Sequence, residues 1–410
     1  MDFSRYENLR TLVRANFSEQ TRALVDEALV YADGKLTGLR RYDGTPLLDH
    51  AVAVAMVVIS EVGLGRNSTV SAILHDVVRL AHKQLPAEEF LALTADIRDR
   101  FGEQVVGLTM GLANISELKL KVAKEQADNF RDLLVSYSED PRVILIKLAD
   151  RLEVMRSLEM FPREKWRKKS WESMNLYAQI AHKLGLYSLK SELEDIALKY
   201  LEPKDYEHIV TKLEESAEER RAFIARFLVP IEERLGKLGI KYHIKSRTKS
   251  IFSIWTKMHK QNVPFEGVYD IFAIRIIIDC DKEQEKQQCW TAYSIVTDFY
   301  TPNPNRMRDW ISIPKSNGYE SLHTTVSAGG RWVEVQIRTE RMDAVAERGI
   351  AAHWRYKGVN QGAQTSEMWL GRLRELLEDT THSLAQRFDA KPCCCAPKRH
   401  AVNMEDMFSA

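Results

Sequence analysis

The sequence predicts a multidomain protein of the α and α+β classes, with an all-helical region followed by a region built on a mixed β-sheet. Three observations support this fold class. Residues 1–200 are rich in helix-forming residues, and their apolar positions recur at helical spacing. Residues 239–358 combine short apolar runs typical of strands with helical segments. The 410 residues suffice for two to three domains, each with its own core.

The composition excludes several partners. Lys and Arg number 59 against 58 Asp and Glu, so a net charge of +1 gives no global field toward nucleic acid or membrane, and neither is expected to bind this chain directly. No run of about 18 apolar residues is present, and the start MDFSRYENLR lacks the features of a signal peptide. We therefore expect a cytoplasmic location.

Three helices of the first region contain candidate metal ligands. LLDHAVAVAMVVISEVGL predicts a largely buried helix, STVSAILHDVVRLA a second one capped by Asn67 or Ser68, and RVILIKLADRLEVMRSLEM a third. Imidazole and carboxylate groups from separate helices can converge on one divalent cation, although the same residues could also only stabilise the fold. The candidate ligands are His50, His75, Asp76 and Asp150.

Two segments flank the second region. Residues 201–238 are highly charged with apolar residues at helical spacing, which predicts linker helices before the pattern changes to strand at KYHIKSR. Residues 359–410 predict an amphipathic helix and a tail that contains Cys393–Cys395. Because consecutive cysteines rarely converge on one zinc ion, and five cysteines do not form a disulfide framework, we expect reduced thiols there.

The second region opens with candidate phosphate-binding residues. IKSRTKSIFSIWTK predicts a strand followed by a helix, with basic residues at the junction, and helix N-termini bind phosphate well. YDIFAIRIIID then predicts an apolar strand interrupted by Asp270 and Arg275. A carboxylate beside a buried strand is costly unless it is paired or metal-bound. Asp270 and Arg275 would face opposite sides of a strand that is regular from its start, so we place Asp270 just before the first regular strand residue.

The stretch RMRDWISIPKSNGYESLHTTVSAGGRWVEVQIR ends in a strand with two different faces. Glu334, Gln336 and Arg338 alternate with apolar residues, and a turn upstream contains Lys315 and Tyr319. This polar face suits metal-bound phosphates, although a hairpin with a solvated outer face would show the same alternation.

Long phrases of the chain resemble one family. NGYESLHTTV and EVQIRTERMDAVAERGIAAHWRYK resemble the synthetase domain of the RelA/SpoT homologues, which make and in many members destroy the alarmone (p)ppGpp. RYDGTPLLDH, AILHDVV and VILIKLADRL resemble the family's HD-type hydrolase domain. The resemblance implies an HD hydrolase-like domain over 1–200, a nucleotidyltransferase-like synthetase domain over 239–358, and ATP with GDP or GTP as substrates of (p)ppGpp synthesis.

The resemblance also implies roles for residues of the synthetase region. Asp270 and Glu334 would bind magnesium and take part in catalysis, and Tyr319 would stack on guanine. The implied ATP-binding residues are Arg247, Lys249, Ser253, Lys257 and Arg275, and the implied GDP- or GTP-binding residues are Arg308, Lys315, Asn317, Tyr319, His323, Gln336 and Arg338. This chain has Ser246 and Thr248 where the family has Gly and Pro.

In the helical region the same resemblance implies manganese at the four candidate ligands, a metal-activated water that removes pyrophosphate, and a guanine nucleotide against Arg41. The chain departs from the family there. Arg79-Leu80 stand where active hydrolases have Glu-Asp, and Glu153-Val154 where they have His-Asn. Because a cation and an apolar group cannot take a proton from water, we expect a degenerate hydrolase with intact ligands.

Two alternatives remain at the level of sequence. A basic Arg-x-Arg at Arg306 and Arg308 is similar to the bifunctional members, which favours an enzyme that also hydrolyses (p)ppGpp with manganese. A non-catalytic nucleotide sensor is the other, although it would not need both Asp270 and Glu334. Long family members continue past a similar Leu-Phe-Ser into a ribosome-sensing region, so we expect a catalytic fragment that reaches the ribosome only through such a region.

Overall fold

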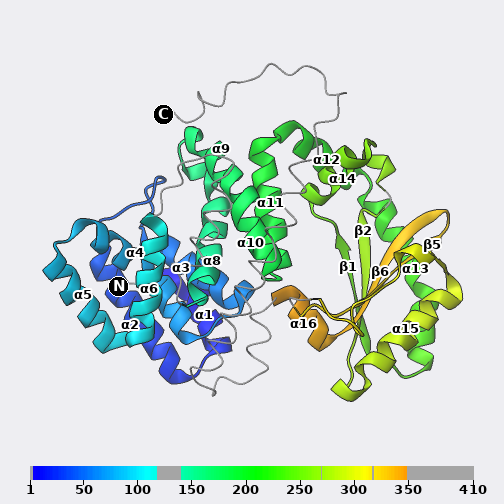
Figure 1. Ribbon diagram of the computed structural model, residues 1–410, viewed down its shortest axis with the longest axis horizontal. Helices are drawn as coiled ribbons and strands as arrows, with labels where there is room; N and C mark the ends of the chain where they lie inside the picture. The colour runs from blue at the N-terminus through cyan, green and yellow to red at the C-terminus, as the bar shows by residue number, and fades with distance from the viewer. Residues whose placement is uncertain (1–2, 118–139, 269, 316–317, 349–410) are drawn as a thin grey trace.

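A computed structural model of the chain describes residues 3–117, 140–268, 270–315 and 318–348, and it contains both predicted regions (Figure 1). A helical half precedes a half built on a mixed sheet, which confirms the fold class predicted from the sequence. Within the described residues no helix is long and apolar enough to cross a membrane. The predicted tail helix and Cys393–Cys395 lie outside the described residues, whereas Cys280 and Cys289 are free thiols.

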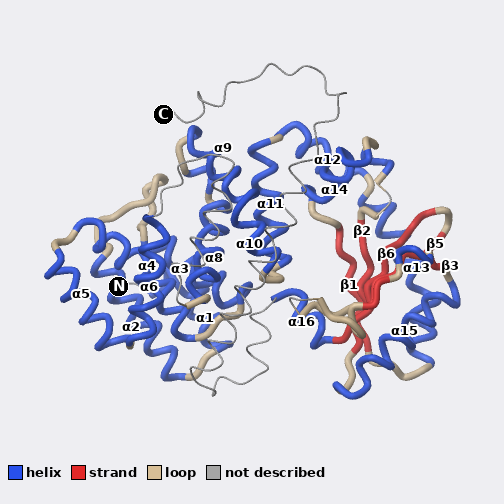
Figure 2. Tube along the Cα trace, in the orientation of Figure 1, coloured by secondary structure: helices blue, strands red, loops and turns tan. Residues whose placement is uncertain are grey.

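The helical half is a bundle around one apolar core. Its helices are α1 Glu7–Asn16, α2 Glu19–Lys35, α3 Leu48–Val57, α4 Arg66–Gln84, α5 Ala87–Phe101, α6 Glu103–Glu117, α8 Arg142–Arg156, α9 Arg163–Glu172, α10 Ala178–Lys183 and α11 Tyr187–Leu201. The helices α3, α4 and α8, which were predicted to contain the metal ligands, pack against one another in this bundle (Figure 2).

The start of α4 corrects one prediction. The helix begins at Arg66 after Gly65, so neither Asn67 nor Ser68 caps it. The Asn67 amide instead donates a hydrogen bond to Gln104 on α6 at 2.7 Å, and Ser68 is buried. Asn67 and Ser68 therefore make tertiary contacts instead of capping the helix.

Two helices fill the predicted linker. They are α12 Pro203–Glu215 and α13 Ala217–Lys237. The residues Phe227, Ile231 and Leu235, spaced four apart on one face of α13, are buried in the core of the sheet half. This helix therefore covers the sheet as well as connecting the halves, while the division into domains remains a prediction.

The second half contains a six-stranded mixed sheet with strand order β1-β2-β6-β5-β3, and β4 pairs with β5 (Figure 2). Strands β2 and β6 run parallel, and the other pairs are antiparallel. The strands are β1 Tyr242–Thr248, β2 Phe272–Ile278, β3 Thr301–Pro302, β4 Arg308–Asp309, β5 Leu322–Ala328 and β6 Arg331–Thr339, and the remaining helices are α14 Ile251–Gln261, α15 Glu285–Phe299 and α16 Glu340–Arg348.

The alternation predicted for β6 gives the sheet two different faces. Val333, Val335 and Ile337 join the core under α13 and α15. The opposite face contains Glu334 and Gln336, which are partly exposed, as predicted. The end of this face lies near α16, and α11 of the helical half contacts both α14 and α16 (Figure 1). The two halves therefore meet beside the polar face of the sheet.

Candidate functional site

The junction of β1 and α14 positions a group of basic and hydroxyl side chains. Arg247 lies near the end of β1, and Ser250 caps α14 by accepting a hydrogen bond from the backbone N–H of Ser253 at 3.2 Å. Lys249 precedes the cap, and Lys257 follows one turn after Ser253 on α14. The predicted phosphate-binding residues therefore come together at a helix N-terminus, where backbone N–H groups favour anions.

Two carboxylates lie beside this group. Asp270 lies before β2, as predicted, with Ile271 between it and the first strand residue Phe272, and Glu334 lies on the polar face of β6. The Lys249 ammonium bonds both carboxylates, at 2.5 Å to Asp270 and 3.1 Å to Glu334, and Lys257 also bonds Asp270. Burial raises the pKa of Asp270, but the two lysines outweigh it and lower that pKa to about 2. Asp270 is thus ionised, and the two carboxylates share the Lys249 ammonium.

The carboxylate pair fits magnesium. Carboxylate oxygens are the ligands that magnesium prefers, and the two side chains already share one positively charged group. Burial raises the pKa of Glu334, but Lys249 and the Gln336 amide outweigh it and hold that pKa below its usual value. These residues can therefore hold a divalent ion in place of Lys249.

The end of the polar face contains an arginine that is completely buried. Arg338 is 0% exposed, so the alternative of a hairpin with a fully solvated outer face does not hold at this residue. Its guanidinium lies 2.7 Å from Asp343, yet none of its three nitrogens makes a hydrogen bond of good geometry within the described residues. Because buried donors are normally satisfied, this guanidinium is suited to an anionic ligand.

Arg275 and Gln336 extend the same network. Paired across β2 and β6, they bond through Arg275 Nε and Gln336 Oε1 at 3.2 Å, and Gln336 donates to Glu334 at 2.8 Å. Arg275 also pairs with Glu347 on α16. Arg247 pairs with Ala273, two residues before Arg275, so the two arginines lie on the same face of the neighbouring strands β1 and β2. Burial and the charge of Arg275 lower the pKa of Arg247. A flat aromatic base between them would separate the charges.

Tyr319 and His323 form a pair on the neighbouring wall. The Tyr319 hydroxyl and His323 Nε2 are 2.7 Å apart, and the Lys315 ammonium lies 4.9 Å from the centre of the tyrosine ring. Burial lowers the pKa of His323 to about 4, so its imidazole is neutral at pH 7. Asn317 lies outside the described residues.

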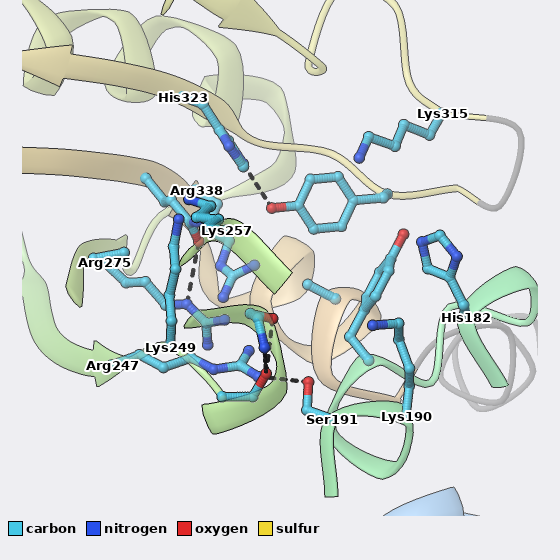
Figure 3. A pocket seen from close by; sticks show the side chains of 17 residues that line it. His182, Lys190, Ser191, Arg247, Lys249, Lys257, Arg275, Lys315, His323 and Arg338 are labelled. Carbon is cyan, nitrogen blue, oxygen red and sulfur yellow. Dashed lines mark hydrogen bonds between the residues drawn. The ribbon is translucent and has the colours of Figure 1, made fainter. Parts of the chain in front are cut away.

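The basic side chains described above, together with Tyr319, His323 and Gln336, line a cavity of about 330 Å³ (Figure 3). Seven lysines and arginines line it: Lys190, Arg247, Lys249, Lys257, Arg275, Lys315 and Arg338. No aspartate or glutamate occurs among its described lining residues. Such a concentration of positive charge indicates a polyanionic ligand.

The predicted guanine-nucleotide residues do not all meet in this cavity. Lys315, Tyr319, His323, Gln336 and Arg338 line it together with the predicted ATP-binding residues. Arg308 instead borders a second hollow of about 270 Å³ with Arg306, His323, Thr325 and Glu334. Its guanidinium bonds the backbone oxygens of Asn305 and Met307. His323 lines both spaces, and Glu334 lines the second.

The helical half brings together three of the predicted metal ligands. One ligand atom from each of His50, His75 and Asp76 lies within 4.8 Å of the others. Asp150 joins them through a 3.2 Å contact with His50 Nε2. Asp76 Oδ2 is buried and has no hydrogen-bond partner among the described residues. This donor set fits a divalent metal ion.

The residues that depart from the family lie directly against these ligands. Arg79 donates to Asp76 Oδ1 at 2.7 Å, and Glu153 bonds His50 Nδ1. Arg41, expected near a guanine nucleotide, donates to Glu153 at 2.7 Å and to Ser157 at 2.8 Å. The Arg79 guanidinium therefore occupies one oxygen of the Asp76 carboxylate, and the Glu153 carboxylate orients the His50 ring.

Several residues of these sites were not predicted from the sequence. Lys147 donates to Asp150 at 2.7 Å, and its spacing of three residues on α8 could have indicated this contact. His182, Tyr187, Lys190 and Ser191 of the helical half line the cavity of the sheet half. Their place at the cavity depends on the contact between the two halves, which local sequence patterns do not indicate.

The fold and sites define a two-part protein in which a cluster of candidate metal ligands in a helical bundle precedes an α+β region with a strongly basic cavity. A family model described as a region found in RelA/SpoT proteins matches residues 246–361, and an HD-domain model matches residues 28–187. The chain therefore contains a region found in RelA/SpoT proteins and an HD domain.

Three curated relatives illustrate the similarity. They are a guanosine-3′,5′-bis(diphosphate) 3′-pyrophosphohydrolase of Aquifex aeolicus (38% identity, 87% of this chain and 49% of the relative), the bifunctional (p)ppGpp synthase/hydrolase SpoT of Escherichia coli K12 (35%, 92% and 53%) and a GTP pyrophosphokinase of Myxococcus xanthus (34%, 87% and 46%). The chain spans about half the length of the curated relatives it matches. These names include both hydrolases and a pyrophosphokinase.

Proposed function

We propose that this chain transfers pyrophosphate from ATP to the 3′-hydroxyl of GDP or GTP and so makes (p)ppGpp. The observation that carries the proposal is a cavity lined by seven lysines and arginines beside two carboxylates that share one cation. The phosphates of a nucleoside triphosphate would supply the negative charge that the described lining residues of the cavity lack. The match to a region found in RelA/SpoT proteins supports the same reaction, and so does the similarity of this chain to a relative named a GTP pyrophosphokinase.

In the proposed reaction the acceptor 3′-oxygen attacks the β-phosphorus of ATP. The bond to the α-phosphate oxygen breaks, AMP leaves, and the hydroxyl proton passes to the Glu334 carboxylate, which is ionised. Magnesium bound by Asp270 and Glu334 would supply charge neutralisation at the phosphates. Lys249, Lys257 and Arg338 would stabilise the transferring phosphates, and Arg247 and Arg275 would hold the adenine.

The direct test incubates the purified chain with ATP, GDP and magnesium and resolves the nucleotides by chromatography. We expect ppGpp and AMP to appear in equal amounts, because one pyrophosphate is transferred for each AMP released. ATP consumption that gives ADP and phosphate instead would contradict the proposal.

We further propose that the helical half binds manganese without hydrolysing (p)ppGpp efficiently. Manganese bound there would lower the pKa of a water molecule, but Arg79 cannot accept its proton. Arg79 also pairs with Asp76 Oδ1, while the unpartnered Oδ2 leaves the cluster able to hold a metal ion. The second candidate function, a working hydrolase, draws support from the same ligand cluster and from the hydrolase names among the relatives.

Asp76→Ala is expected to remove metal binding from the helical half. The purified chain should retain about one manganese ion through gel filtration, measured by mass spectrometry of the metal, and the variant close to none, because Asp76 is buried and supplies the carboxylate among the three clustered ligands. Asp96→Ala, which removes a surface carboxylate paired with Arg100, is the matched control and should retain the metal. Equal retention by both variants would refute the proposed ligand set.

A further inference from the structure

One wall of the basic cavity comes from the helical half. Tyr187, Lys190 and Ser191 lie on one face of α11, because residues three and four apart are neighbours on a helix. His182 adds the end of α10 to the same wall. In Figure 3, Lys190, Ser191 and His182 lie across the cavity from Lys249, Arg275 and Arg338 of the sheet half.

This wall is attached to the sheet half by specific contacts. The Asp195 carboxylate, one turn after Ser191 on α11, accepts a hydrogen bond from the backbone N–H of Phe252 at 2.8 Å in the first turn of α14. Ser191 Oγ accepts a longer hydrogen bond from Arg247 at 3.5 Å. The rings of Tyr187 and Tyr319 are nearly perpendicular, with their centres 5.9 Å apart. The contacts hold α11 in register with the phosphate-binding junction.

Lys190 is held at the cavity by a buried partner. Its ammonium lies 2.6 Å from Glu194 Oε2, one helical turn along α11, and Glu194 is 1% exposed. An ammonium has three N–H donors, and Glu194 takes one of them. Lys190 is the only lysine or arginine that the helical half contributes among the described residues lining the cavity.

We propose that Lys190 is a nucleotide-binding residue that bonds a phosphate of ATP, so that the helical half completes the donor site of the sheet half. This rests on the proposed function. The donor nucleotide is favoured over the acceptor because Ser191, adjacent to Lys190, contacts Arg247, one of the two arginines assigned to adenine. Glu194 fixes the position of the lysine side chain and does not itself line the cavity.

The test compares Lys190→Gln with the unmodified chain in calorimetric titrations with α,β-methylene-ATP and magnesium. The analogue cannot be cleaved at the bond that the reaction breaks. Because a charge-assisted hydrogen bond at a partly exposed site is lost, we expect the Kd to rise about tenfold. The Kd for GDP should stay within about twofold. In the synthesis assay KM for ATP should rise by a similar factor, with kcat changed less than about threefold.

Two controls separate binding from structure. Lys199→Gln removes a lysine from the same helix that pairs with Glu159 outside the cavity, and it should leave the Kd within about twofold. Glu194→Gln breaks the ion pair but keeps the cation, so its Kd should change less than that of Lys190→Gln. If Lys190→Gln does not fold, the double variant Lys190→Met/Glu194→Met replaces the pair without leaving a buried charge and should show the same tenfold weakening.

The outcomes distinguish this inference from the proposed function. An unchanged Kd in Lys190→Gln, or a loss confined to GDP, would overturn the role of Lys190 and leave the synthetase proposal standing. Binding of the analogue that depends on Lys190, without formation of ppGpp by the unmodified chain, would refute the proposed reaction alone. If the unmodified chain does not bind the analogue, both fail.

Discussion

Glu334→Gln is expected to abolish ppGpp synthesis, with kcat at least about 10³-fold lower than that of the unmodified chain. Glu334 is one of the two carboxylates bonded by Lys249, and its charge would help to hold magnesium and accept the 3′-hydroxyl proton. Glutamine keeps the size of the side chain and a hydrogen bond to Gln336, but it is neutral and cannot accept that proton at pH 7. The measurement is the initial rate of ppGpp formation with ATP and GDP at saturating magnesium.

The same chemical change elsewhere in the sheet half provides the control. Glu340, the first residue of α16, has a side chain that is 60% exposed and lies outside the cavity lining. Glu340→Gln should keep the rate within about twofold of the unmodified chain. Thermal unfolding of both variants shows whether each is folded. A folded Glu334→Gln variant that retains more than about one tenth of the rate would exclude this carboxylate from the chemistry.

Local sequence patterns predicted the parts of the site that depend on one strand or one helix. The alternation of β6 correctly separated Glu334 and Gln336 from the apolar face, because the side-chain period of a strand is fixed. The opposite parity of Asp270 and Arg275 correctly placed Asp270 before β2 rather than inside it. In these cases the backbone geometry alone decides where the side chain lies.

The features that the sequence did not reveal depend on contacts between distant segments. Alternation placed Arg338 on the polar face, but its complete burial depends on how other elements cover that end of the sheet. Lys190 belongs to the helical half, so its place in the cavity follows from the docking of α11 against α14 and α16. Arg308 lies on the short strand β4 and borders a second hollow that the sequence did not indicate, and its role toward a guanine nucleotide stays a prediction.

The helical half supports a prediction of gained activity. Arg79→Glu/Leu80→Asp is expected to raise manganese-dependent release of pyrophosphate from ppGpp by about 10²-fold or more over the unmodified chain. The substitution removes the guanidinium that bonds Asp76 Oδ1, and it places carboxylates where the RelA/SpoT family has an acidic pair. The measurement uses labelled ppGpp with manganese and follows the released pyrophosphate.

A neutral version of the same change separates the two effects of Arg79. Arg79→Gln/Leu80→Asn also frees Asp76 Oδ1 from the guanidinium, but it supplies no group that takes a proton from water. If the lost base is the defect, only the acidic variant gains activity. If the guanidinium blocks the metal, both variants bind manganese more tightly than the unmodified chain, and the neutral one remains inactive. Rapid hydrolysis by the unmodified chain would show that the helical half works without an acidic pair, and the second candidate function would then replace the degenerate site.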